Sequence, residues 1–245
     1  MTVLMETKVV DKASIGDVQS NIHYPSYKSF DEFIDIEHLR SLNHYISNKI
    51  KRRIQQTGDS YFLNEHRLDE SSPYAPGARE IWLSRTRAGT PYNYLDLDRP
   101  ELWEPTADAA EFTLLMEFVS KLPFKATGRI LIIYDEGGRE VPAHRDHERV
   151  DICNEFIWLR TNLNKPFYLL NERTGNKAYV KSYSAWFDTV NQFHGCDAAN
   201  GLTFSIRVDG VFTEKFRSPI PKPTYNAAST PSLWACANGG SGAAN

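Results

Sequence analysis

The stretch Gly128-Arg-Ile-Leu-Ile-Ile-Tyr-Asp-Glu-Gly-Gly-Arg-Glu-Val-Pro-Ala-His-Arg-Asp-His147 decides which fold we expect. Its first seven residues are mostly apolar and β-branched, which predicts a strand, and Asp135-Glu-Gly-Gly138 is a turn signal. The chain then leads through Val-Pro-Ala into His144 and Asp146, which lie two residues apart. Because side chains at positions i and i+2 of a strand share one face, this imidazole and this carboxylate can converge on one point.

A second histidine, His194, stands 50 residues (194 minus 144) beyond the first. A strand-like run, Tyr183-Ser-Ala-Trp-Phe-Asp-Thr-Val190, precedes it, and a second run, Leu202-Thr-Phe-Ser-Ile-Arg-Val-Asp209, follows it and contains Arg207. Two imidazoles and one carboxylate on one face of a metal leave the opposite positions open, which is the ligand set of non-haem Fe(II) oxygenases. The alternative is a surface turn and an unrelated core histidine, and the regular succession of strands and turns favours the metal site. His147 is expected to face away and not to be a ligand.

On these residues the sequence resembles the Fe(II)/2-oxoglutarate-dependent oxygenase superfamily, and within it the aspartyl/asparaginyl β-hydroxylase and proline-hydroxylase-like branch. The resemblance covers roughly residues 128–216. It includes Phe156-Ile-Trp-Leu-Arg-Thr-Asn-Leu163, where Arg160 and Asn162 occupy the places of that branch's Arg-x-His motif. It implies a mainly β fold with flanking helices around a double-stranded β-helix, a cupin-like jelly roll.

The same resemblance implies the domain organisation. We expect one oxygenase domain over residues 1–217. Within it, residues 1–127 would form a helical or irregular support and lid region, and residues 128–217 the metal-binding core. The proline-rich and glycine-rich segment 218–245 predicts a disordered tail.

Two departures from the branch affect the expected site. The β-hydroxylase proper has glycine at the position of Asp146, so a full triad is expected here, as in the proline-hydroxylase-like members. In this branch a basic residue follows the second histidine ligand. It often lies nearer that histidine in sequence than Arg207 lies to His194. A close alignment would place it at Thr203, and Arg207 is four residues further along the same face of the strand.

The resemblance also assigns metal and co-substrate. His144, Asp146 and His194 would hold Fe(II), which 2-oxoglutarate would chelate as co-substrate. Its distal C5 carboxylate needs a buried cation, because an unpaired carboxylate inside a barrel is strongly destabilised. Arginine suits this role by its bidentate geometry, and Arg207 is expected to fill it.

Three further residues complete the expected co-substrate site. Arg160, together with Asn162, would steady the C1 end of 2-oxoglutarate, and Tyr134 would donate a hydrogen bond to either carboxylate. The expected reaction is hydroxylation of an unactivated C–H bond of a small molecule, an amino acid or a peptide. It would consume O2 and release succinate and CO2. The acidic and aromatic segment 91–105 is a candidate lid and fits such a substrate, with surface packing against the core as the equal alternative.

Two other classes of function stay open. One is a cupin-type metal enzyme that does not use 2-oxoglutarate and therefore needs neither Arg207 nor Arg160. The other is a non-catalytic jelly-roll binding protein, against which the intact set of three ligands argues. Stoichiometric Fe(II) binding and succinate formation would separate these classes from the oxygenase.

The amino-acid composition limits the classes of partner that we expect the chain to bind. The chain has 245 residues with a formal net charge of −3, from 28 Lys and Arg against 31 Asp and Glu. Nothing in this balance predicts binding to nucleic acid or to an anionic membrane. Three cysteines, Cys153, Cys196 and Cys236, form neither a zinc spacing nor a disulfide framework. With no signal-peptide pattern and no apolar window of transmembrane length, a cytoplasmic localisation is expected, and the oligomeric state is not indicated.

Two helices are expected before the strand-rich region. Leu39, Leu42, Ile46 and Ile50 recur with helical spacing, and the basic residues at 49–53 are expected near the end of that helix. A second helix is expected over residues 106–121. Thr106 would be its N-cap, Asp108 would interact with the helix dipole, and the stripe Phe112, Leu115, Met116 and Val119 would pack on the core.

Overall fold

The computed structural model describes residues 3–4, 27–57, 62–68, 77–90, 97, 99–146, 155–189 and 192–217. The expected tail 218–245, residues 91–96 and 98 of the candidate lid 91–105, and the residue His147 lie outside the described residues. The described end of the candidate lid forms the 3-10 helix η3 (Pro100–Leu102) and strand β5 (Trp103–Pro105), which pairs with β4 (Arg79–Thr86). Among the described helices, none has the length and apolar character that crossing a membrane requires.

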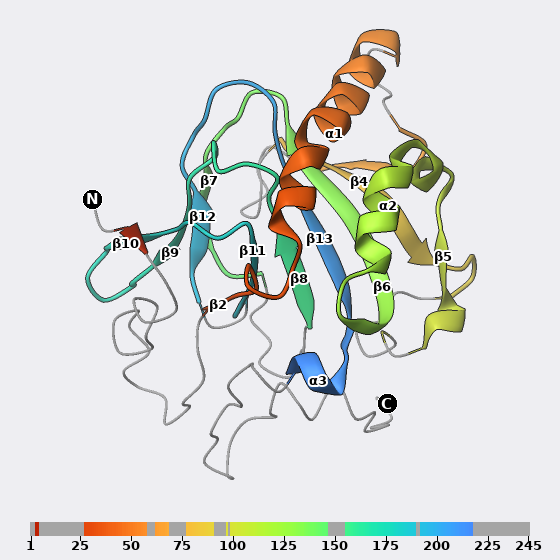
Figure 1. Cartoon of the computed structure of the whole chain (residues 1–245). Helices are drawn as coiled ribbons and strands as arrows, with labels where there is room; N and C mark the ends of the chain where they lie inside the picture. Colours follow the sequence, from red (N-terminus) through yellow and green to blue (C-terminus); the bar gives the residue numbers. More distant parts are fainter. Residues whose placement is uncertain are drawn as a thin grey trace.

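Two antiparallel sheets, apart from one parallel edge pair, form the core of the protein (Figure 1). The larger sheet has the order β2-β11-β8-β13-β6-β4-β3, with β5 paired to β4. Its strands are β2 (Tyr27–Ser29), β3 (Glu65–Arg67), β4 (Arg79–Thr86), β5 (Trp103–Pro105), β6 (Phe124–Asp135), β8 (Phe156–Leu159), β11 (Ser184–Phe187) and β13 (Thr203–Phe212). The smaller sheet has the order β1-β10-β9-β12-β7. Its strands are β1 (Val3–Leu4), β7 (Val141–His144), β9 (Phe167–Leu170), β10 (Lys177–Val180) and β12 (His194–Cys196).

The order in which the chain visits the sheets makes the fold a jelly roll. From β6 to β9 each strand lies in the sheet opposite to the previous one, β10 stays beside β9, and β11, β12 and β13 alternate again. Eight strands that wind between two facing antiparallel sheets in this way are a double-stranded β-helix. The expected fold class is therefore confirmed, and the strand predicted at 128–134 is the central part of β6.

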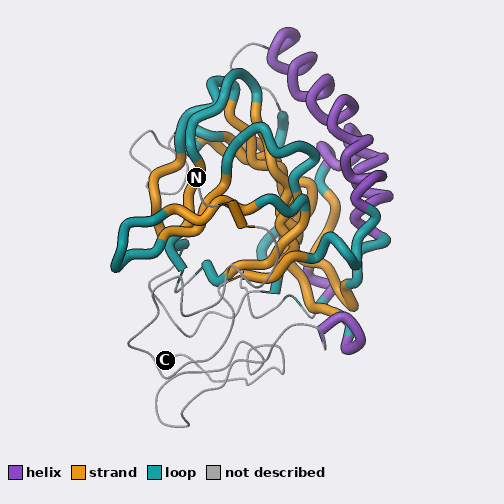
Figure 2. The backbone as a smooth tube through the Cα atoms, turned by 60° about the vertical axis from the view of Figure 1, so that its left-hand side comes forward, coloured by secondary structure: helices purple, strands orange, loops and turns teal. Residues whose placement is uncertain are grey.

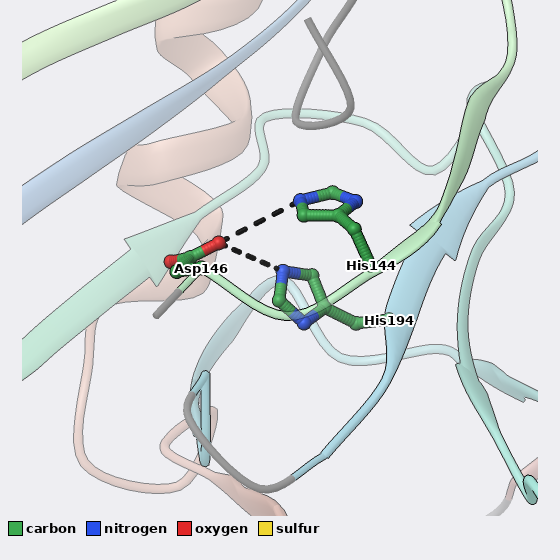
Figure 3. Close-up of side chains that lie close together, drawn as sticks. All are labelled: His144, Asp146 and His194. Atoms are coloured by element: carbon green, nitrogen blue, oxygen red, sulfur yellow. Dashed lines mark ion pairs between the residues drawn. The ribbon is translucent and has the colours of Figure 1, made fainter. Parts of the chain in front are cut away.

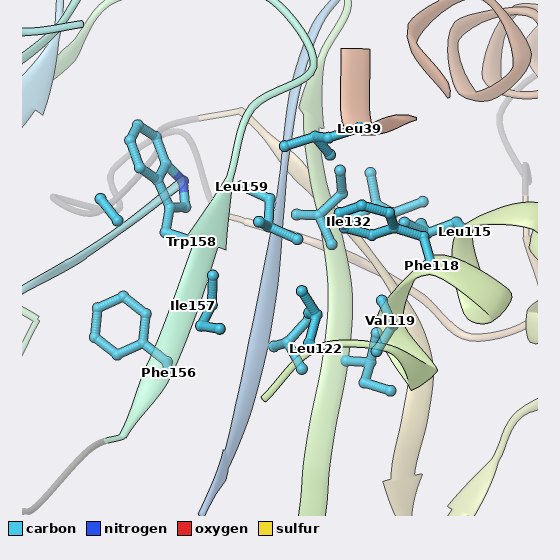
Figure 4. Close-up of a cluster of buried hydrophobic side chains, with 14 of the residues drawn as sticks. Leu39, Leu115, Phe118, Val119, Leu122, Ile132, Phe156, Ile157, Trp158 and Leu159 are labelled. Carbon is cyan, nitrogen blue, oxygen red and sulfur yellow. The ribbon is translucent and has the colours of Figure 1, made fainter. Parts of the chain in front are cut away.

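Helices cover one face of the larger sheet, and the smaller sheet lies on the other side (Figures 1 and 2). The helices are α1 (Ile36–Thr57), η3 (Pro100–Leu102), η4 (Ala107–Phe112), α2 (Thr113–Ser120) and α3 (Glu214–Arg217). The predicted apolar stripe of α1, from Leu39 to Ile50, is buried, as are Leu115 and Val119 of α2. Figure 4 shows Leu39, Leu115 and Phe118 gathered around Ile132 of β6.

Strand alternation gives the larger sheet two different faces. On β8, Ile157 and Leu159 point toward the helices, whereas Phe156 and Trp158 point away from them (Figure 4). On β6, Ile130 and Ile132 belong to the helix-covered core, and Leu131 faces the interior of the jelly roll, where it lines a cavity. The interior face carries side chains that line this cavity.

Both helix predictions need correction at their ends. Helix α1 continues to Thr57, so residues 49–53 lie before its last turn, which contains no basic residue. Lys49 and Arg53 instead form ion pairs with Glu111, at 3.8 Å in each case. These cations are therefore bound by a neighbouring side chain, and not placed by the helix dipole.

The second predicted helix is a 3-10 helix, η4, followed by α2. Thr106 stands at the N-cap of η4 but makes no capping bond; its hydroxyl donates to the carbonyl oxygen of Trp82 at 2.7 Å. Asp108 is buried and accepts hydrogen bonds from the backbone N–H groups of Leu63 and Asn64. Asp108 thus lies in the first turn of η4, as predicted, and it also fastens the segment before β3 through a tertiary contact that the local sequence did not show.

Candidate metal centre

Strand pairing brings the two predicted histidines together. In the antiparallel pair β7–β12, His144 lies directly opposite His194. The next residue, Gly195, has no space for a side chain, because a Cβ atom there would lie 2.6 Å from both the Tyr168 hydroxyl and the Val141 carbonyl oxygen. Gly195 therefore allows β12 to lie close to its neighbours at the point where the histidine must be positioned.

Asp146 reaches the same point by a route that differs from the prediction. Strand β7 ends at His144, so Asp146 lies in the bend that follows and does not share a strand face with it. Its backbone N–H donates to the carbonyl oxygen of Thr189 at 2.8 Å, which fixes the bend against the segment before His194. The convergence of the three side chains is as expected, but a tertiary hydrogen bond produces it.

The three side chains form a compact group (Figure 3). The Nε2 atom of His144 lies 3.6 Å from Oδ1 of Asp146, and Nε2 of His194 lies 3.3 Å from the same oxygen. One potential ligand atom from each residue lies within 4.8 Å of the other two. Among the described residues, this is the only cluster of three or more His, Cys, Asp or Glu side chains with metal-binding geometry.

Hydrogen bonds at the other ring nitrogens fix the tautomers. Nδ1 of His144 lies 2.8 Å from the carbonyl oxygen of Pro142, and Nδ1 of His194 lies 3.1 Å from that of Gln192. A carbonyl oxygen can only accept, so both Nδ1 atoms carry the proton in the neutral rings. Both Nε2 lone pairs then face Asp146 Oδ1 with no proton between them. A cation at the centre of the group would remove this repulsion, so the donor set fits a divalent metal ion.

Asp146 is held as a carboxylate. Burial acts to raise its pKa, but the adjacent side chains of His144 and His194 and the nearby charge of Arg207 outweigh burial and hold the pKa well below its usual range. Nη1 of Arg207 donates to Oδ2 at 3.1 Å, which leaves Oδ1 directed at the two imidazoles. The two oxygens of the carboxylate therefore have separate partners.

Arg207 belongs to a chain of buried charges. Its Nε donates to Oδ1 of Asp209 at 2.9 Å, and the other carboxylate oxygen accepts a bond from Arg129 Nε at 2.7 Å. Asp209 is completely buried, and the Arg207 guanidinium lies 4.2 Å from the centre of the Phe156 ring. Two carboxylates thus compensate the charge of Arg207. This arrangement makes Arg207 a residue that positions Asp146, which differs from the predicted role at the distal carboxylate of 2-oxoglutarate.

Sequence reasoning missed Asp209 and Arg129. A signal for Asp209 was present, because an acidic residue in an apolar strand two positions from Arg207 shares its face. No comparable signal marked Arg129, whose partner is 80 residues away in the sequence.

A cavity of about 400 Å³ opens beside the three ligands. Its lining is largely apolar and aromatic, with a small number of polar groups, as in sites for small molecules. The wall includes Leu131, Ile133, Phe156, Trp158, Phe167, Phe187, Ser205 and Arg207. There is room for an organic ligand next to the metal position.

Arg160 is 4% exposed, and its guanidinium lies 4.7 Å from the centre of the ring of Trp158, which lines this cavity. Its Nη2 donates to the carbonyl oxygens of Val180 and Ser182, while Nε and Nη1 have no hydrogen-bond partner. Burial lowers its pKa to about 10, so the side chain is still charged at neutral pH. Each buried donor left without an acceptor destabilises a protein by about 1–3 kcal/mol.

Two predicted site residues are placed elsewhere. Tyr134 is on the helix-covered face of β6, where its hydroxyl donates to Glu65 Oε2 at 2.6 Å. Asn162 donates from its side chain to Oδ1 of Asn43 on α1, at 2.6 Å, and neither residue lines the cavity. In both cases the fold directs the side chain toward the helices.

Comparisons with known proteins give distant likenesses. No protein-family model matches the sequence, and no curated protein matches it. Three solved structures are similar over most of the chain. A prolyl-4-hydroxylase from Pseudomonas putida has 12% identity, covers 77% of this chain and 93% of its own, and gives a TM-score of 0.42. A Trichoplax adhaerens prolyl hydroxylase in complex with a hypoxia inducible factor peptide fragment has 12% identity, coverages of 79% and 86%, and a TM-score of 0.41. A 2OG-Fe(II) oxygenase family oxidoreductase from Burkholderia pseudomallei has 11% identity, coverages of 70% and 81%, and a TM-score of 0.35.

Proposed function

We propose that this chain is an Fe(II)- and 2-oxoglutarate-dependent oxygenase that hydroxylates an unactivated C–H bond of a small molecule, such as an amino acid or a peptide. One observation carries the proposal. Two Nε2 lone pairs and a carboxylate oxygen converge in the interior of a jelly roll, with both Nδ1 atoms committed to carbonyl oxygens. Two histidines and one carboxylate leave three coordination positions of an octahedral metal open.

The residues of the chain have distinct tasks in this reaction. His144, Asp146 and His194 would hold Fe(II), which together with 2-oxoglutarate and O2 supplies the oxidising chemistry when bound. Arg207 keeps Oδ2 of Asp146 occupied, so that Oδ1 stays directed at the metal position. The aromatic wall, which includes Phe156, excludes water from the reacting centre.

We also infer the branch of the superfamily from the carboxylate of Asp146. Asp146 completes a triad that the β-hydroxylase proper lacks, so the proline-hydroxylase-like members of the branch are the better comparison.

The proposed catalytic domain spans residues 1–217, and the proposed localisation is the cytoplasm.

The test is metal binding and succinate formation by the purified chain. Anaerobic calorimetry should give one Fe(II) per chain, and turnover of 2-oxoglutarate to succinate should require Fe(II) and O2, with stimulation by compounds from a panel of amino acids and peptides. His194→Ala should abolish tight iron binding and turnover, because it removes one of three ligands. His44→Ala, which changes an exposed histidine on α1, should leave both unchanged.

Two results would overturn the proposal in different ways. Iron binding without any succinate would indicate a cupin-type enzyme that does not use 2-oxoglutarate. Wild-type iron affinity in His194→Ala would show that the three residues do not hold the metal.

A further inference from the structure

The cavity beside the metal position has a second carboxylate in its wall besides that of Asp146. This is Glu80, which lies on β4 and is half-buried. Its Oε2 accepts a hydrogen bond from Nε1 of Trp82 at 3.0 Å, and the two side chains share one face of the strand. Within the described part of the chain, Oε1 has no donor and no ion pair joins Glu80 to a cation.

The other charges of the cavity wall compensate one another. Arg129 and Arg207 are its two arginines, and Asp209 and Asp146 are their carboxylate partners. A divalent metal ion and the two carboxylates of 2-oxoglutarate carry opposite charges of equal size, so their arrival leaves this balance unchanged. The loaded wall therefore keeps one net negative charge, that of Glu80.

The basic side chains nearest Glu80 in the sheet are directed at other groups. His66 lies opposite Glu80 on β3, but its ring packs edge-on against that of Trp82, with 5.4 Å between the ring centres. The guanidinium of Arg129 lies 5.6 Å from the centre of the same ring, and its Nε donates to Asp209 at 2.7 Å. A half-buried carboxylate is stabilised when a cation binds beside it, and a ligand can supply that cation.

Strand register gives the position of Glu80 relative to the metal centre. Glu80 lies opposite Ile133, and Ile133 lies opposite Ser205, two residues before Arg207 on β13. Arg207 contacts the ligand Asp146. Two strand spacings correspond to about 10 Å. A molecule that reaches from the metal position to Glu80 must therefore be elongated, with its cationic group several bonds away from the reacting carbon.

The surroundings of Glu80 indicate which kind of cation fits. A guanidinium binds best to both oxygens of a carboxylate, whereas an ammonium group acts as a point charge. Because Trp82 already donates to Oε2, Oε1 is the oxygen that remains without a donor. Leu68 and Ile133 also line the cavity and offer apolar surface to an alkyl chain. These features favour an alkylammonium group.

We propose that Glu80 binds an ammonium group of the substrate, so that the site selects primary amines. Either the α-amino group of an amino acid or peptide or an amine on its side chain has this chemistry. The inference rests on the proposed function, because that function makes the cavity a substrate site.

The test compares two small probes that differ in charge. Saturation-transfer NMR titrations of the Zn(II)-loaded protein would measure its affinity for pentylamine and for 1-pentanol. The wild type should bind pentylamine about 10-fold more tightly, as expected for one hydrogen bond to a charged group. Glu80→Gln has nearly the same shape and keeps an oxygen that can accept from Trp82, and it should remove the preference.

Two further variants make the result specific. Glu80→Arg should reverse the selection, so that pentanoate binds more tightly than pentylamine. Glu136→Gln removes the same charge from an exposed residue outside the cavity wall, and it should keep the full preference of the wild type.

A second pair of probes identifies the source of the ammonium group. Nα-acetyl-L-lysine keeps only the side-chain amine, and Nε-acetyl-L-lysine keeps only the α-amino group. Tighter binding of the first assigns the side-chain amine to Glu80, and tighter binding of the second assigns the α-amino group. A difference between them that persists in Glu80→Gln would contradict the inference.

The inference is overturned if the wild type binds pentylamine and 1-pentanol equally. It is also overturned if the preference survives in folded Glu80→Gln or is lost in Glu136→Gln. The proposed function fails by a different result, the absence of metal binding at the three ligands. The same comparison of wild type and Glu80→Gln in the metal-free protein then still decides whether Glu80 binds the cation.

Discussion

Along β6, Ile132 and Ile133 are neighbours in sequence and lie in different environments. Ile132 is fully buried beneath the helices, whereas Ile133 is half-buried and lines the cavity. The same holds on β8, where Ile157 is in the helix-covered core and Trp158 is in the cavity wall. Each strand therefore supplies alternate residues to stability and to binding.

The two faces of the larger sheet differ in whether their polar groups have partners within the protein. Much of the helix-covered face is apolar, and the Tyr134 hydroxyl at its edge has a protein partner. The interior face keeps charges in pairs near the metal position, as for Arg129 with Asp209, and leaves one cation, Arg160, with donors unused. Unused donors destabilise the empty protein and become useful when a ligand binds.

The largest effect is expected when the side chains of Ile132 and Ile133 are truncated one at a time. Ile132→Ala should lower the free energy of unfolding by about 2–5 kcal/mol, because it leaves a cavity in a packed core. Ile133→Ala should lower it less, since that side chain already borders a cavity, but should weaken 2-oxoglutarate binding. Urea denaturation and calorimetry on the Mn(II)-loaded variants measure both quantities. Equal losses of stability, with ligand affinity unchanged in both variants, would show that the faces are not separable.

A smaller effect is expected at Arg207. Arg207→Met removes the donor to Asp146 Oδ2, and loss of a partner that orients a metal ligand lowers metal affinity by about 10- to 100-fold. Arg129→Met is the matched control, because it removes the other partner of Asp209 while the bond from Arg207 to Asp146 remains. Mn(II) titration of the two variants gives the comparison. Similar metal affinities in both would show that Arg207 has no special role in orienting Asp146.

The smallest effect is expected at Tyr134. Tyr134→Phe removes the hydrogen bond to Glu65, whose carboxylate keeps its ion pair with Arg79 at 3.1 Å. The loss should be about 1 kcal/mol of stability, with no change in 2-oxoglutarate affinity. Thermal unfolding and calorimetry test this, and a drop in affinity at constant stability would restore the role that the sequence suggested.

The sequence predicted the site better than it predicted the roles within it. His144, Asp146 and His194 were identified by residue type, spacing and the strands around them, and the structure brings them together. The assignments that differ, Tyr134, Asn162 and Arg207, all depended on which way a side chain points or on what it already contacts. Strand alternation fixes that neighbours point to opposite sides, but it does not say which side faces the interior when both are apolar.

By itself the sequence indicated several of the strands, the two amphipathic helical segments and the three residues of the candidate metal centre, because hydrophobic period and ligand chemistry are local properties of the chain. Only the tertiary structure decided that Asp146 acts from a bend held by Thr189, that Arg207 is occupied by Asp146 and Asp209, and that Arg160 is buried without an anion. The physical reason is that these contacts, apart from the one between Arg207 and Asp209, join residues 20 to 61 positions apart, as between Arg160 and Val180 or Arg207 and Asp146. Those partners exist only after the two sheets have packed together.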